Sequence, residues 1–335
     1  MKIGILGAGQ IVPYHLTALK SVGFDLQLIG ASRNSTNASR LAKQFDIPTV
    51  LDSATEILEK IHLIDCLLIA TSSPKLFEFL ELVAPFDIPV LVEKPVFARR
   101  EHLLHEHLIS RLNSRVQVGY NRRFYESINA FKENVLKVQG GSLAFTIPEL
   151  SNQESHTLDK SLSTIIENTV HMFDLLFFIN DCFDPDLFQI TSKSSENLPF
   201  SIGFRSQNLL KDIDLKIYFS VPDNYSITFR SPGVLLELKP LEIFRKYRGI
   251  EVIEPTSNYP LRSYKPIQEL EIVTSMEAIK DRPIKPGFRG QALEFLNFVH
   301  TRRLTRGASL LEATQVSRMA FKVVDEITSR FFSAD

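Results

Sequence analysis

The chain has 335 residues, of which 44% are hydrophobic and 23% charged, and its formal net charge is −1. This length suits two domains with a large buried core. The near-neutral charge argues against nucleic acid or an anionic membrane surface as a partner. The two cysteines, Cys66 and Cys182, form neither a disulfide framework nor a zinc-ligand spacing, so we expect no metal site.

The chain begins with an apolar segment, residues 3–6, that has the pattern of a buried strand. We therefore expect no signal peptide ahead of the fold. No uninterrupted apolar run approaches the roughly 20 residues that span a bilayer. The expectation is a cytoplasmic protein without membrane contact.

Short apolar runs alternate with helix-like segments over residues 1–121. Each run is apolar on consecutive positions, as strands are when helices cover both faces of a parallel sheet. This repetition predicts a doubly wound α/β Rossmann domain over residues 1–121. The runs span residues 3–6, 26–31, 63–70, 90–92 and 116–118, and the helix-like segments residues 12–22, 38–45 and 76–83.

The pattern changes near residue 138. Strands follow one another in series around a helix at about residues 163–179, which predicts an α+β domain with a large, mostly antiparallel sheet over residues 122–335. Residues 250–285, rich in proline and polar residues, are predicted to form a loop. The last helices can pack back on the Rossmann domain. The strands are expected at residues 142–146, 188–193, 200–207, 214–220, 225–230 and 234–238, and the last helices at residues 290–302 and 309–331.

Gly7 and Gly9 stand between the first strand and the first helix. In a dinucleotide-binding turn, the first glycine permits the tight turn and the second lets the backbone approach a pyrophosphate at the helix N-terminus. We expect Gln10 and Ile11 to complete this cofactor contact. Val12 occupies the place of a third glycine and predicts slightly wider spacing of helix and strand. A plain strand–helix turn is the alternative.

Ser32 and Arg33 follow the strand at residues 26–31, where an acidic residue would bind the ribose 2′-hydroxyl of NAD. Ser32 can donate a hydrogen bond, and Arg33 can pair with a 2′-phosphate. The sequence therefore favours NADP over NAD. A solvated loop position for Arg33 is the alternative.

Four further segments occur in order along the chain. They are Thr71-Ser72-Ser73-Pro74, Glu93-Lys94-Pro95, Gly119-Tyr120-Asn121-Arg122-Arg123-Phe124 and His171-Met172-Phe173-Asp174-Leu175-Leu176. With the glycine turn ahead of them, they make the chain resemble the Gfo/Idh/MocA oxidoreductases, the family of glucose–fructose oxidoreductase and inositol dehydrogenase. The resemblance extends from residue 4 to about residue 176. It implies hydride transfer between NAD(P) and a hydroxyl or keto group of a sugar, nucleotide sugar or cyclitol.

The resemblance also implies roles for three residues. Lys94 and His171 match the catalytic lysine and histidine of the family, and Glu167 occupies a position that is more often aspartate. The resemblance gives His171 the proton transfer, Lys94 the polarisation of the reacting oxygen, and Glu167 the orientation of that pair. The four-residue spacing would place Glu167 and His171 on one helix face. Lys94 and His171 could exchange the acid and base roles.

Further contacts complete the expected site. Thr71, Ser72, Glu93 and Lys94 are expected at the cofactor. Tyr120, Asn121 and Asp174 are expected at the substrate, with a structural ion pair as the alternative for Asp174.

Three functional alternatives remain open from the sequence. A catalytically weak NAD(P)-binding sensor or scaffold is one, and a lyase or hydrolase that holds NAD tightly is another. The leading interpretation is a dehydrogenase or reductase that forms a dimer or tetramer through its C-terminal sheet.

Overall fold

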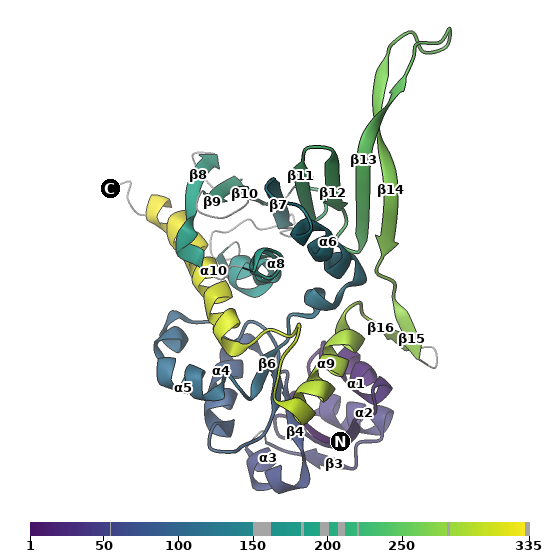
Figure 1. Ribbon diagram of the computed structural model, residues 1–335. Coiled ribbons are helices and arrows are strands. Elements are labelled where there is room, and N and C mark those ends of the chain that lie inside the picture. The colour runs from purple at the N-terminus through teal and green to yellow at the C-terminus, as the bar shows by residue number, and fades with distance from the viewer. Residues whose placement is uncertain are drawn as a thin grey trace. The chain divides into compact units, whose positions relative to one another are not determined.

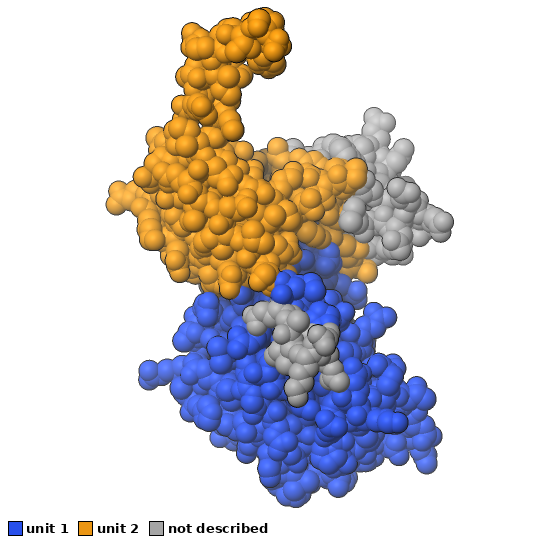
Figure 2. Space-filling model, turned by 90° about the vertical axis from the view of Figure 1, so that its right-hand side faces the viewer, with its two compact units in different colours: residues 1–124, 165–175, 276–335 blue, residues 125–164, 176–275 orange. Residues whose placement is uncertain are grey.

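The computed structural model describes residues 1–53, 55–149, 162–181, 184–194, 201–206, 212–219, 221–279 and 282–331. Cys182 and the outer residues of some predicted strands lie outside these ranges. The chain divides into two compact units, coloured separately in Figure 2. Unit 1 comprises residues 1–124, 165–175 and 276–335, and unit 2 comprises residues 125–164 and 176–275. Unit 1 thus contains both ends of the chain.

Unit 1 contains a six-stranded parallel sheet in the order β3-β2-β1-β4-β5-β6, with helices on both faces (Figure 1). The predicted doubly wound sheet is confirmed. The strands are β1 (Lys2–Leu6), β2 (Asp25–Gly30), β3 (Thr49–Leu51), β4 (Cys66–Ile69), β5 (Val90–Val92) and β6 (Val116–Val118). The connecting helices are α1 (Val12–Ser21), α2 (Thr36–Phe45), α3 (Glu56–Glu59), η1 (Ile61–Leu63), α4 (Ser73–Val83), η2 (Arg100–Leu104), α5 (Glu106–Leu112) and η3 (Asn121–Phe124).

The C-terminal helices α9 (Phe288–Thr301) and α10 (Leu310–Phe331) also belong to unit 1. The ring of Phe295 on α9 stacks on Phe24, which follows α1, at 5.9 Å between centroids. Between the two helices, Ala308 forms a bridge to Val118 of β6. These contacts extend the Rossmann core with residues far away in sequence. A two-stranded ribbon of β15 (Glu277–Ile279) and β16 (Arg282–Ile284) precedes α9.

Unit 2 contains an eight-stranded sheet in the order β14-β13-β12-β11-β7-β10-β9-β8. Only β7 and β10 pair in parallel, so the predicted, mostly antiparallel sheet is confirmed. Alternate residues of β10 are fully buried, which gives one covered face. The strands are β7 (Ser142–Glu149), β8 (Phe188–Ser194), β9 (Ser201–Ser206), β10 (Asp212–Phe219), β11 (Ser226–Ser231), β12 (Val234–Leu238), β13 (Ile243–Ile253) and β14 (Ser263–Val273), with helices α6 (Glu126–Leu136) and η5 (Pro185–Leu187).

The loop predicted over residues 250–285 is wrong. β13 runs into this segment and pairs with β14, and both strands extend beyond the rest of their sheet (Figure 1). The segment lacks the usual alternation of apolar and polar residues because its outer part is exposed on both faces. Pro266 is tolerated because β14 is an edge strand.

The helical segment Leu162–Asn180 has the length and mean hydropathy, 1.3, of a membrane span, but 61% of it is buried inside the protein. The segment carries two acidic residues, Glu167 and Asp174. Its buried share is typical of a helix in the core of a folded domain. The segment includes the π-helical turn η4 (Ile165–Thr169) and the helix α8 (Val170–Asn180).

Candidate active site

The glycine turn joins β1 to α1 with the backbone that a dinucleotide requires. Gly7 has φ +113°, and a Cβ there would lie 2.2 Å from the carbonyl oxygen of Ala70, so only glycine fits. A Cβ at Gly9 would meet nothing within 4 Å. The backbone at Gly9 is therefore open to the close approach of a ligand. No side chain caps the N-terminus of α1, Pro13 has no N–H, and the N–H groups of Val12 and Tyr14 bond to the main-chain oxygens of Gly9 and Ile11, so the helix offers an anion the positive end of its dipole.

A cavity of about 750 Å³ lies at this turn. Eight of the ten residues predicted to bind the cofactor line it, namely Gly7, Gly9, Gln10, Ile11, Ser32, Arg33, Thr71 and Ser72. They come from three places in the sequence, after β1, β2 and β4, which meet at the carboxyl edge of the parallel sheet. The size and the open glycine fit an extended dinucleotide.

The cavity wall includes two charged residues that the sequence analysis missed. Lys75, in the first turn of α4, adds a second cation. Asp52 follows β3, whose Leu51 pairs with Gly30 of β2, and its carboxylate accepts a hydrogen bond from the Asn34 N–H at 3.3 Å. The segment directly after β2 has no carboxylate, and Asp52 reaches the same wall from the neighbouring strand. β3 has only three residues at the sheet edge, so the pattern of apolar runs did not locate Asp52.

Glu93 lies away from the cavity wall, in the protein interior. Its Oε1 is 2.6 Å from His15 Nε2, and its Oε2 accepts a hydrogen bond from the Lys94 N–H at 3.2 Å. The ring of His15 packs edge-on against Phe288 at 4.8 Å between centroids. Glu93 therefore fixes the backbone next to Lys94, in contrast to the direct cofactor contact that we predicted.

Lys94 follows β5 at the same sheet edge as Thr71 and Tyr120. Parallel pairing of Ile69 with Val92, and of Val92 with Val118, brings the ends of β4, β5 and β6 side by side. The Lys94 ammonium donates a hydrogen bond to the main-chain oxygen of Glu167 at 2.7 Å. This contact joins the sheet edge to η4, directly ahead of His171.

His171 is half-buried at the start of α8, with its ring edge-on to Tyr120 at 6.1 Å between centroids. Its Nδ1 is buried without a hydrogen-bond partner among the described residues. Burial, together with the positive charges of Lys94 and Arg122, holds the pKa of His171 well below its usual range. The imidazole is therefore neutral near pH 7 and able to accept a proton.

The predicted role of the Glu167 carboxylate is not supported by the structure. Its side chain is exposed, and the contact to Lys94 comes from the main-chain oxygen instead. Glu167 lies in the π-helical turn η4, which presents its main-chain oxygen to Lys94.

The predicted substrate contacts fall into two groups. Tyr120 is 1% exposed, and its hydroxyl has no hydrogen-bond partner within the described part of the chain. Burial and the charge of Asp174 raise the pKa of Tyr120, so the hydroxyl stays protonated. Asn121 uses its amide group to bind the main-chain oxygen of Pro286 at 3.0 Å. Asp174 is fully buried, and both its oxygens accept hydrogen bonds from Arg123, which makes it a structural ion-pair partner instead of a substrate contact.

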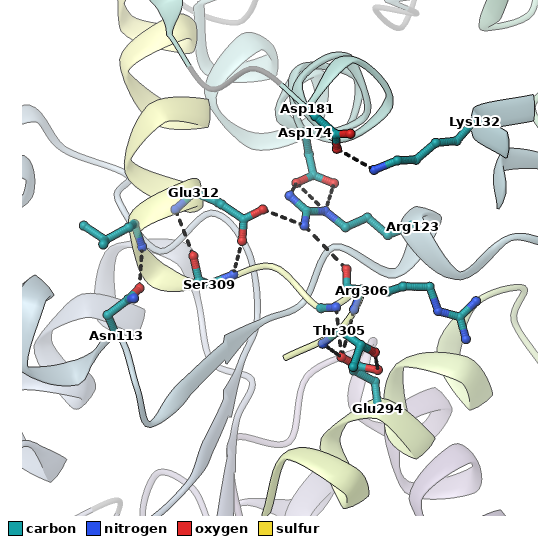
Figure 3. Close-up of polar contacts among 12 residues, drawn as sticks. Asn113, Arg123, Lys132, Asp174, Asp181, Glu294, Thr305, Arg306, Ser309 and Glu312 are labelled. Carbon is teal, nitrogen blue, oxygen red and sulfur yellow. Dashed lines mark hydrogen bonds and ion pairs between the residues drawn. The ribbon is translucent and has the colours of Figure 1, made fainter. Parts of the chain in front are cut away.

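Arg123 is the centre of a buried charge network that the sequence analysis missed (Figure 3). Its guanidinium donates to Asp174 at 2.7 Å and to Glu312 at 3.0 Å, and the Arg123 side chain is 2% exposed. Although burial opposes the charge, Asp174 and Glu312 raise the pKa of Arg123. A capping box of Ser309 and Glu312 starts α10 at the same point. Glu294 accepts hydrogen bonds from three residues of the preceding loop, Thr305, Arg306 and Gly307.

This network connects three segments of unit 1, namely η3, the first turns of α8 and the start of α10. Arg123 lies three residues after Tyr120, and Asp174 lies three residues after His171. The network therefore fixes the backbone of both proposed site segments. Within the described residues, no group of three His, Cys, Asp or Glu side chains is placed to hold a metal ion.

Comparison with known proteins agrees with this geometry. Residues 1–120 match the family model described as an oxidoreductase family with an NAD-binding Rossmann fold, Gfo/Idh/MocA. The N-terminal domain belongs to the Gfo/Idh/MocA family. The resemblance in the sequence is thus confirmed. No curated protein sequence matches the chain.

Solved structures of Gfo/Idh/MocA oxidoreductases and other dehydrogenases share the fold over the whole chain. A dehydrogenase from Clostridium difficile aligns with a TM-score of 0.73 at 17% identity, covering 98% of this chain and 99% of that one. The UDP-N-acetylglucosamine 3-dehydrogenase from Acidithiobacillus ferrooxidans gives 0.73 at 15% identity, covering 98% of each chain. The myo-inositol dehydrogenase from Lactobacillus casei, solved with NAD(H) and myo-inositol, gives 0.66 at 16% identity, covering 96% of this chain and 92% of that one.

Proposed function

We propose that this protein is an NAD(P)-dependent dehydrogenase or reductase that transfers a hydride between nicotinamide and a hydroxyl- or keto-bearing carbon of a sugar, nucleotide sugar or cyclitol. The observation that carries the proposal is the Lys94 ammonium bonded to the turn ahead of His171, at the sheet edge that also forms the dinucleotide cavity. The bound cofactor supplies the hydride acceptor or donor.

His171 carries the proton in this proposal. Because its pKa is held low, the neutral imidazole accepts the hydroxyl proton when an alcohol is oxidised and returns it in the reverse reaction. The Lys94 ammonium, oriented by the Glu167 carbonyl, stabilises the negative charge that develops on the reacting oxygen. The buried hydroxyl of Tyr120 is available to a substrate oxygen. The main-chain oxygen of Glu167 takes the positioning role that the sequence gave to its carboxylate.

The substrate class rests on the relatives and on the polar groups of the site. The fold is shared with enzymes named for UDP-N-acetylglucosamine and myo-inositol, both rich in hydroxyl groups. Lys94, His171 and Tyr120 form a compact polar set suited to one secondary alcohol and its neighbours. A cytoplasmic location, where nicotinamide cofactors are abundant, is part of the proposal.

For the cofactor, we propose a preference for NADP that depends on two opposing charges. Arg33 and Ser32 line the cavity and would bind a 2′-phosphate, whereas the Asp52 carboxylate on the same wall would repel it. Parallel titrations with NADPH and NADH test the balance. Arg33→Ala should weaken NADPH about tenfold while NADH changes little, and Asp52→Asn should strengthen NADPH. If the wild type binds NADH more tightly than NADPH, the proposed preference for NADP is wrong.

Turnover is tested by screening sugars, nucleotide sugars and cyclitols while following nicotinamide absorbance. The proposal expects a substrate whose oxidation is lost in Lys94→Met. Cofactor binding without turnover of any of these substrates would favour a sensor or scaffold instead. Cofactor that stays bound through purification, with no net change of its redox state during turnover, would favour a lyase or hydrolase.

A further inference from the structure

A buried pair of ionisable side chains, His15 and Glu93, lies in unit 1 and has no part in the proposed chemistry. His15 belongs to α1 and Glu93 follows β5, and the two residues are 2% and 8% exposed. Nε2 of His15 is 2.6 Å from Oε1 of Glu93. Taking such a pair out of water costs free energy, and apolar side chains of similar volume often give equal or greater stability. Stability alone therefore does not explain the pair, and its contacts indicate a positioning role.

The two carboxylate oxygens of Glu93 have different partners. Oε1 contacts His15, and Oε2 accepts a hydrogen bond from the Lys94 N–H at 3.2 Å. The main chain of Glu93 is itself fixed, because its N–H donates to the Ile69 oxygen of β4 at 2.8 Å. The carboxylate therefore connects the His15 ring to the main chain of Lys94.

Gly119 leaves the space that the Glu93 carboxylate occupies. A Cβ at Gly119 would lie 3.2 Å from Glu93 Oε1 and 3.2 Å from the main-chain oxygen of Val92, so a side chain there would crowd the carboxylate. The Gly119 N–H donates to that Val92 oxygen at 2.7 Å, which holds the residue against the end of β5. The carboxylate is thus enclosed between Gly119 and His15.

His15 connects this carboxylate to the helix that follows the glycine turn. The His15 N–H donates to the main-chain oxygen of Ile11 at 3.4 Å, and Ile11 lines the dinucleotide cavity. The His15 ring packs edge-on against Phe288 of α9. Neither His15 nor Glu93 lines the cavity itself. The pair therefore reaches Lys94 without forming part of the cavity wall.

The position of the Lys94 main chain determines where its ammonium lies. The ammonium donates to the Glu167 oxygen at 2.7 Å, and a hydrogen bond weakens steeply when its donor moves away. A misplacement of about 1 Å at a catalytic group can lower a rate by about 10²-fold. We propose that His15 is a positioning residue for hydride transfer: it holds the Glu93 carboxylate against the Lys94 N–H and so keeps the lysine in place relative to the cofactor-binding turn. This role rests on the oxidoreductase function proposed above.

Substitutions at the pair separate positioning from stability. His15→Leu removes the ring nitrogen, and kcat should fall about 10- to 100-fold while the Kd values for NADPH and NADH stay within about twofold of the wild type. His15→Gln keeps an N–H for Glu93 and should recover most of the rate. In His15→Leu/Glu93→Leu, apolar side chains replace the buried pair, so the melting temperature should approach that of the wild type while kcat stays low. Recovery of kcat in this double variant overturns the proposal.

Hydrogen exchange of the Lys94 N–H gives a second readout that needs neither cofactor nor substrate. In NMR spectra of protein with isotope-labelled lysine, this amide should exchange at similar rates in the wild type and His15→Gln, and about tenfold faster in His15→Leu. His102→Leu is the matched control, because His102 is a buried histidine of unit 1 that stacks on Phe77 at 4.6 Å between ring centroids. The control should leave Lys94 exchange and kcat unchanged.

The exchange measurement also distinguishes the two ways in which this account can fail. Equal Lys94 exchange in the wild type and His15→Leu overturns the positioning role of His15, whatever the activity. A wild type that turns over none of the screened substrates contradicts the oxidoreductase function, and the exchange rates then still decide whether His15 holds Lys94.

Discussion

The six-stranded sheet of unit 1 and the outer part of the β13–β14 hairpin of unit 2, residues 248–268, which we call the arm, are opposite cases of strand formation. Strands such as β4 and β5 are fully buried and apolar on consecutive residues, so their own side chains specify them. The arm is exposed on both faces and mixes proline, charged and apolar residues. Burial by the same chain explains the sheet. In the arm, backbone pairing between β13 and β14 joins the two strands although their side chains are exposed.

The largest effect is expected at the buried charge network of unit 1. Arg123→Met leaves Asp174 buried without its cation, and this should cost about 3–5 kcal/mol of unfolding free energy. Urea denaturation measures the loss. The double variant Arg123→Met/Asp174→Leu should recover most of it, because no uncompensated charge remains. A cost below about 1 kcal/mol for the single variant contradicts the network's role.

Lys94 should give the largest effect on catalysis. Lys94→Met removes the ammonium bonded to the Glu167 carbonyl, and kcat should fall about 10²- to 10³-fold, as when one stabilising donor is lost. Steady-state kinetics with the best substrate measures this. Lys75→Met on the cavity wall is the control: it should raise KM for the cofactor and leave kcat nearly unchanged. Equal loss of kcat in both variants argues against a specific role for Lys94.

The low pKa of His171 predicts the pH dependence of oxidation. The rate should be flat above pH 6.5 and should fall as the pH drops through the lowered pKa, since only the neutral imidazole accepts a proton. Unfolded His171 binds a proton at higher pH than folded His171, so this residue's contribution to stability also decreases as the pH falls below about 6.5. In His171→Asn this acid limb of the rate profile should disappear. A limb centred at or above pH 6.5 contradicts the assignment.

A matched pair of aliphatic truncations compares the two regions directly. Leu68→Ala in the fully buried β4 should cost about 2–5 kcal/mol. Ile250→Ala in the arm should change the free energy of unfolding by no more than about 0.5 kcal/mol, because this side chain is exposed. Urea denaturation of the two variants measures the difference. A cost for Ile250→Ala close to that of Leu68→Ala contradicts the comparison.

The sequence predicted the Rossmann sheet, the glycine turn and eight residues of the cavity wall, because these depend on local patterns of apolar residues and glycine. Gly7 and Gly9 could be recognised without knowledge of distant contacts. Residues fixed by tertiary contacts were not predictable in this way. Asp52 follows a three-residue edge strand, and Arg123 meets its partners only after α10 packs beside η4.

The role of Glu167 illustrates the same limit on a smaller scale. The four-residue spacing from Glu167 to His171 predicted a carboxylate that orients the Lys94–His171 pair, but the Glu167 side chain is exposed. A main-chain oxygen, which no sequence motif identifies, contacts Lys94 in place of the carboxylate.

The most direct test of the central claim, that the sheet edge of unit 1 binds a dinucleotide, is calorimetric titration of NADPH and NADH into the wild type and Gly9→Val. Space for a side chain exists at Gly9, so the variant should fold with an unchanged melting temperature, but its side chain occupies the place of the pyrophosphate. The account predicts micromolar binding to the wild type and loss of binding in Gly9→Val. Absence of binding to the wild type, or equal binding to both proteins, contradicts it.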